Sequence, residues 1–147
     1  MMNNWRTILE EVDTLAETAG KQAGLPSPAI KAFDGDVWIR SWRKQVGTAF
    51  VEVQLRLRPD AFEEGLEAQI SARAWMAKRP DYSWVRTFST QYWSWEIWDS
   101  LRQTLEKELV NEFSRAWKEA NKAAPRLPQI RLRRQNTLKT LRDKKLL

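Results

Sequence analysis

The residues of this chain that could carry chemistry are carboxylates, arginines, lysines and tryptophans, because its 147 residues include no His and no Cys. Without them the chain has no thiol nucleophile, no disulfide, no imidazole acid–base group and almost none of the usual zinc ligands. It also has only five Gly and lacks a Gly-rich phosphate-binding motif. We therefore expect no enzymatic activity, no cofactor and no metal site.

Aromatic and arginine residues recur in three segments that have the spacing of strands. An uncovered sheet face that carries both types can stack bases or bury a partner peptide. The alternatives are that the first of these strands turns its Trp side chains into the core, or that the C-terminal segment covers the sheet. The candidate partner-binding residues are Trp38, Arg40, Trp42, Phe50, Arg56, Arg73 and Trp75.

Positive charge is concentrated at the C-terminal end. Residues 126–147 carry eight basic residues and one acid, whereas residues 1–125 carry seventeen basic and eighteen acidic residues. This basic arm could bind phosphates, dock on the body through its interspersed leucines, or be disordered. Its basic residues are Arg126, Arg131, Arg133, Arg134, Lys139, Arg142, Lys144 and Lys145.

One pair of acids suggests a different chemistry. Asp36 is followed sixteen residues later by Glu52, within Val-Glu-Val-Gln. This pattern resembles the PD-(D/E)XK nucleases, in which a helix precedes a β-hairpin whose acidic residues hold Mg²⁺. The resemblance implies that Glu10 or Glu11 would supply the acid of the first helix. Gln54 stands where the family has Lys, so the resemblance also implies a non-catalytic relative.

The hydrophobic spacing predicts the elements that must position these residues. Apolar residues recur with helical period over 5–19 and 94–123, and they alternate with a period of two over 49–58 and 66–77. Residues 37–44 and 82–88 are also expected to be strands, and Gly20 is expected to end the first helix. Pro28 and the residues through 33 are expected to form a short helix.

These elements predict one α+β domain over 1–125, followed by a basic C-terminal arm over 126–147. An antiparallel sheet of three or four strands would be flanked by an N-terminal helix and a long C-terminal helix. Exposed edge strands would also allow a homo-oligomer formed by sheet extension.

From these features we expect a non-enzymatic binding or adaptor protein that engages another protein. The first alternative is a nucleic-acid-binding accessory protein that uses the basic arm, and the second is a degenerate nuclease fold. The chain has neither a membrane-spanning apolar run nor the apolar core of a signal peptide. A cytoplasmic location without membrane binding is therefore expected.

Overall fold

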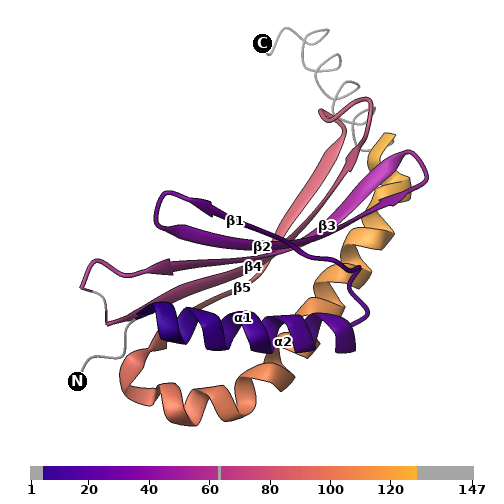
Figure 1. Ribbon diagram of the computed structural model, residues 1–147. Helices are drawn as coiled ribbons and strands as arrows, with labels where there is room; N and C mark the ends of the chain where they lie inside the picture. Colours follow the sequence, from indigo (N-terminus) through magenta and orange to yellow (C-terminus); the bar gives the residue numbers. More distant parts are fainter. Residues whose placement is uncertain (1–4, 63, 129–147) are drawn as a thin grey trace, which may run out of the picture.

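The computed structural model describes residues 5–62 and 64–128 (Figure 1). Within these residues α1 comes first along the chain, followed by five strands and then by α2. The elements are α1 (Trp5–Gln22), β1 (Ile30–Asp34), β2 (Val37–Val46), β3 (Ala49–Pro59), β4 (Gly65–Met76), β5 (Ser83–Ser94), the 3₁₀ turn η1 (Trp95–Ile97), α2 (Trp98–Ala123) and the 3₁₀ turn η2 (Ala124–Arg126). The α+β class and both flanking helices are as predicted, but the sheet formed by the described residues has five strands instead of three or four.

Each strand of the sheet pairs antiparallel with the next, in the order β1-β2-β3-β4-β5. Two-residue loops close the first two hairpins, between Asp34 and Val37 and between Val46 and Ala49. Gly35 and Gly47, the first residues of these loops, have φ of 64° and 62°. Glycine adopts this left-handed conformation without the steric cost of a Cβ, which suits tight hairpin turns.

The predicted short helix over 28–33 is wrong, because residues 30–34 form β1. Pro28 is compatible with a helix start, but the Gly35 turn folds this segment back onto β2, where it pairs from Ile30–Ser41 to Asp34–Val37. Pairing with a neighbouring strand decided the conformation, and a local propensity could not reveal it.

The last strand is longer than predicted and reaches Ser94, so α2 begins at Trp98 instead of residue 94. A register shift between β4 and β5 explains why the sequence pattern did not predict the second half of β5. Ser71 of β4 pairs with Thr87, whereas Ile70 pairs with Ser89, which leaves Phe88 as an extra residue in β5. This bulge reverses the phase of the in–out alternation, so a single period of two cannot describe the whole strand.

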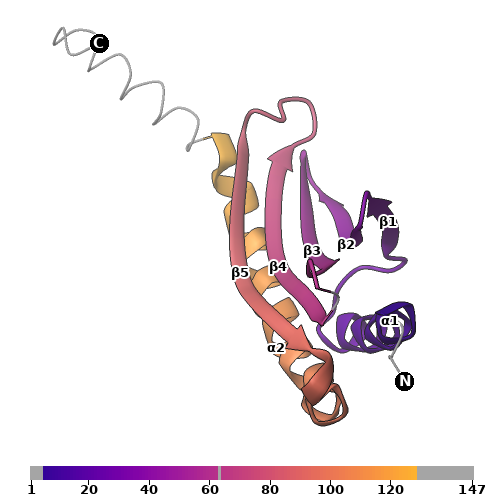
Figure 2. The ribbon, with the colours of Figure 1, turned by 90° about the vertical axis from the view of Figure 1, so that its left-hand side faces the viewer.

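Both helices pack on the same face of the sheet, and α2 runs along β4 and β5 (Figure 2). The core between them consists mainly of aliphatic side chains from α1, β3, β4 and α2, together with buried aromatic residues of β2, β5 and α2. Its most deeply buried members include Val12, Ala16, Val51, Val53, Leu55, Leu57, Leu105, Leu109, Phe113, Ala116 and Ala120. The opposite face of the sheet is not covered by any described element.

The packed unit reaches beyond the boundary expected at residue 125. Leu127 is 0% exposed and belongs to the hydrophobic core, and η2 contacts β3 and β4. Arg126, which the sequence placed in the basic arm, therefore lies within the packed unit and is exposed there. The remaining arm residues, Arg131, Arg133, Arg134, Lys139, Arg142, Lys144 and Lys145, lie outside the described residues.

No helix in the described part of the chain has the length and apolar character needed to cross a membrane. The cytoplasmic location stays a prediction, as does a homo-oligomer formed through the exposed edge strand β1.

Candidate functional site: the uncovered sheet face

The uncovered face of the sheet is a grid of side chains in cross-strand rows. Residues opposite one another in antiparallel strands point to the same face, so the pairing register assigns every member. From one end of the strands to the other, the rows are Gln45–Phe50–Trp75–Ser83, Arg43–Glu52–Arg73–Val85, Ser41–Gln54–Ser71–Thr87, Ile39–Arg56–Gln69–Thr90 and Arg58–Glu67–Tyr92. Aromatic and charged residues are concentrated at the two ends, and small polar residues fill the middle.

At one end the aromatic and arginine side chains form what we call the Trp75 platform, composed of Arg43, Phe50, Glu52, Arg73 and Trp75. The Phe50 and Trp75 rings are stacked, with centroids 5.5 Å apart and planes 27° apart. The guanidinium carbons of Arg73 and Arg43 lie 4.4 Å and 5.2 Å from the Trp75 ring centroid. Both distances are within the range of a cation–π contact.

Glu52 fixes the two arginines of the Trp75 platform. Its carboxylate is 0% exposed. Arg43 Nε donates to Oε2 at 2.9 Å, and Arg73 Nε donates to Oε1 at 2.7 Å. A buried carboxylate is costly unless it is paired and hydrogen-bonded, and here each oxygen has its own guanidinium partner. The two arginines are therefore held in place beside the indole.

Towards the other end, the face sinks into a hollow of about 300 Å³, which we call the Arg56 hollow. It is lined by Arg56, Arg58, Glu67, Gln69 and Thr90, among others. Arg58 donates to Glu67 Oε2 at 2.6 Å. Arg56 is half-buried and makes no ion pair with any described residue.

The structure places Phe50, Arg56, Arg73 and Trp75 together on this uncovered face. The candidates Trp38, Arg40 and Trp42 are not on this face, so the alternative in which the first of the three strands turns its Trp side chains into the core is the correct one. They are opposite Leu57, Leu55 and Val53, so they point to the face that the helices cover.

Each of these three side chains is buried, with an exposure of 6%, 4% and 3% for Trp38, Arg40 and Trp42. Arg40 is ion-paired with Asp13 of α1, and Trp42 packs on Phe113 at a centroid distance of 4.8 Å. The sequence left open which residues of 37–44 point outward. If Trp38 and Trp42 point inward, the alternation of the strand turns Arg43 outward. Gln69 and Thr90 carried no sequence signal that would have singled them out.

The nuclease-like acids do not come together. Both oxygens of Glu52 are occupied by arginines. Asp36 lies in the loop just before Val37, and Glu52 is opposite Arg43, so they are separated by about 20 Å along the strands. Among residues 5–62 and 64–128, no three acidic side chains are close enough to hold a metal ion. The side chains present therefore do not fit the Mg²⁺ site that the resemblance implied.

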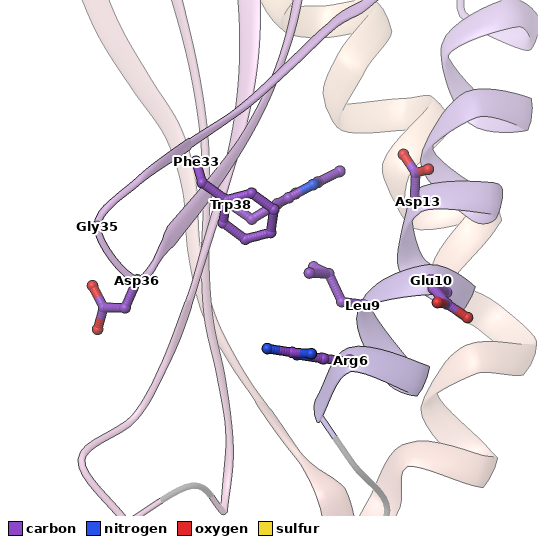
Figure 3. A pocket seen from close by; sticks show the side chains of 8 residues that line it. All are labelled: Arg6, Leu9, Glu10, Asp13, Phe33, Gly35, Asp36 and Trp38. Atoms are coloured by element: carbon purple, nitrogen blue, oxygen red, sulfur yellow. The ribbon is translucent and has the colours of Figure 1, made fainter.

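A second concavity, of about 590 Å³, lies between α1 and the β1–β2 hairpin (Figure 3). Leu9 of α1 points toward Phe33 and Trp38 of the hairpin, which give it an apolar wall. Asp13, on its rim, accepts from Lys31 Nζ at 3.1 Å and is also paired with Arg40. Asp13 is thus paired with two cationic side chains.

Comparisons of the chain with protein-family models, with curated proteins and with solved structures found no match.

Proposed function

We propose that this protein is a non-enzymatic binding protein whose uncovered sheet face engages another protein. The observation that carries this proposal is the Trp75 platform, in which a half-exposed indole is stacked on Phe50 and flanked by Arg43 and Arg73. Trp and Arg are the residue types most enriched among those that dominate binding energy at protein interfaces.

Preorganisation supports the same proposal. Ordering a flexible side chain at an interface costs about 0.5–1.5 kcal/mol. Arg43 and Arg73 are already held by the buried Glu52 through hydrogen bonds of 2.9 Å and 2.7 Å. A partner that contacts this face therefore meets a surface whose long side chains have largely lost their freedom on folding.

The experiment is a quantitative affinity isolation from the native source, with the full-length chain as bait. The proposal expects one protein retained at fixed stoichiometry, with its affinity reduced about tenfold or more by Trp75→Ala. Gln103→Ala, at an exposed position of α2 on the other side of the molecule, is the matched control and should retain the partner. Equal retention by Trp75→Ala and the unchanged chain would refute the proposal.

The second candidate function is nucleic-acid binding, and it rests on the charge of residues 126–147, with eight basic residues and one acid. It expects affinity for single-stranded DNA to fall steeply with salt. Replacing Arg131, Arg133 and Arg134 by Ser in the full chain should then abolish retention. Retention that persists in this triple variant would exclude the arm as the binding element.

A further inference from the structure

The hydrogen-bond donors of the Arg56 hollow come from three adjacent strands. Arg56 of β3 is opposite Gln69 of β4, which is opposite Thr90 of β5, so the three side chains form one row across the sheet. They contribute a guanidinium, an amide and a hydroxyl, all of which can donate hydrogen bonds. The concavity that they line measures about 300 Å³, which is enough for an incoming side chain.

Arg56 differs from the other arginines of this face in its charge balance. Arg43 and Arg73 share Glu52, and Arg58 is bonded to Glu67. Arg56 is half-buried, yet within the described part of the chain it makes no ion pair. A guanidinium pairs with a carboxylate through two parallel N–H···O bonds, an arrangement that is both strong and geometrically specific.

We propose that the Arg56 hollow is an anion subsite that receives a carboxylate side chain of the protein partner. This inference rests on the proposed function and adds the chemistry of the partner to it. The occupant is an Asp or Glu of a partner segment that lies across the uncovered face, paired with Arg56 and flanked by Gln69 and Thr90.

The balance of charge on the face favours a protein carboxylate over a nucleic acid. The four arginines of the face are offset by two paired glutamates, and residues 1–125 as a whole are close to neutral. Nucleic-acid affinity depends on the neutralisation of several phosphates at once. Of the two arginines that line the hollow, Arg58 is paired with Glu67, so the charge of Arg56 matches a single anionic group instead.

The distance between the Trp75 platform and the Arg56 hollow also sets the spacing of the residues by which a partner would bind to them. Phe50 of the Trp75 platform and Arg56 are six residues apart on β3, and the opposite residues Trp75 and Gln69 are six apart on β4. Six residues of strand correspond to about 20 Å. An extended partner segment that runs along the strands would thus place its apolar anchor and its acidic residue about six positions apart.

The test is an NMR titration of the full-length protein that follows the Arg56 Nε–H and the Gln69 side-chain amide. The probes are a hexaglutamate peptide, a hexaglutamine peptide, inorganic phosphate and a twelve-residue oligothymidylate. We expect hexaglutamate to shift both signals, with an affinity about tenfold above that of hexaglutamine. In Arg56→Gln the response of Gln69 should be lost, and Arg56→Lys, which keeps the charge without the planar fork, should be intermediate.

Arg79, which is exposed and bonded to Asp81, reports non-specific effects of charge and ionic strength. The inference is overturned if hexaglutamate shifts Arg79 as much as Arg56, or if Gln69 still responds in Arg56→Gln. It is also overturned if phosphate or the oligonucleotide acts at a lower concentration than hexaglutamate. These outcomes leave the proposed function standing, because the Trp75→Ala isolation tests that function separately.

Discussion

The indole of Trp42 on β2 lies directly against Gly20 of α1. A Cβ added at Gly20 would be 2.9 Å from the Trp42 Nε1 atom and 3.1 Å from Cε2. The helix does not end at this glycine, as the sequence suggested, but continues to Gln22. Gly20 is therefore the point at which the helix comes close enough to the sheet to bury a Trp whose orientation the sequence left open.

Gly20→Ala should destabilise the protein by a net amount of up to about 2 kcal/mol. The overpacking that displaces the indole costs about 1–3 kcal/mol. Alanine favours a helix over glycine by about 1 kcal/mol, which offsets only part of this cost. Urea denaturation measures the difference. Thr18→Ala, exposed in the same part of the helix, is the control and should change little.

Removing the steric partner provides the second half of the Gly20 test. In the double variant Gly20→Ala with Trp42→Phe, the smaller ring makes room for the new methyl group, so the two substitutions should cost less together than the sum of their separate costs. Gly20→Ala alone being more stable than the unchanged chain would contradict the close contact.

Glu52→Gln should destabilise the protein by about 1–3 kcal/mol, because a neutral amide cannot compensate two guanidinium groups. The cost stays below that of breaking a fully buried pair, since Arg43 and Arg73 both reach solvent. Chemical denaturation measures this change in the free energy of unfolding. Glu67→Gln breaks an exposed arginine pair on the same face and should leave the midpoint almost unchanged; equal effects of the two substitutions would show that burial of Glu52 has no energetic consequence.

Leu127→Ala should cost about 2–5 kcal/mol, the usual range for a buried leucine that leaves a cavity. Its side chain is 0% exposed and packs in the core after α2 has ended. The matched control is Arg126→Ala at the exposed neighbouring position, which should leave the stability unchanged. If both variants melt at the temperature of the unchanged chain, the packed unit ends before residue 127.

Tyr92 should titrate far above an ordinary tyrosine. Its hydroxyl donates to Asp60 Oδ2 at 2.5 Å, and this hydrogen bond raises the pKa of Tyr92 to about 12. Ultraviolet titration of phenolate formation, with Tyr92→Phe subtracted to isolate this group, measures it. Asp60→Asn should return the pKa of Tyr92 toward about 10.

The same hydrogen bond makes stability depend on pH in two directions. Because the folded pKa of Tyr92 is raised, its contribution is present below about pH 10 and is lost as pH rises through about 12. The hydrogen bond from Tyr92 lowers the pKa of Asp60, so that contribution is present above about pH 3.9 and is lost as pH falls through the lower folded pKa. Both dependences should weaken together in Asp60→Asn, and a stability profile identical to that of the unchanged chain would contradict the contact.

Strong periodicity made part of the fold and site predictable. The alternation over 49–58 and 66–77 placed Phe50, Arg56, Arg73 and Trp75 on the face opposite the core, and the structure has them there. Trp38 and Trp42 were ambiguous, because a Trp suits a core and an interface equally well. Nothing local distinguished the two orientations; the register that pairs Trp42 with Val53 did so.

The remaining differences arise from contacts between segments distant in the sequence. Strand β1 is short and exposed throughout, so it had no hydrophobic alternation to detect. Phe88 broke the alternation of β5 by occupying a bulge that is visible only against β4. The two arginines of Glu52 come from β2 and β4, on either side of the carboxylate.

The sequence by itself determined the separation of a nearly neutral body from a basic C-terminal segment, the lack of imidazole and thiol chemistry, and the two central strands. These follow from composition and from periodicity within a single segment. Only the tertiary structure decided which side chains share a face, that Glu52 lies buried between two arginines, and that Arg56 has no acidic partner among the residues that the structure describes. The physical reason is that strand register and close packing are properties of pairs of segments, so no single segment encodes them.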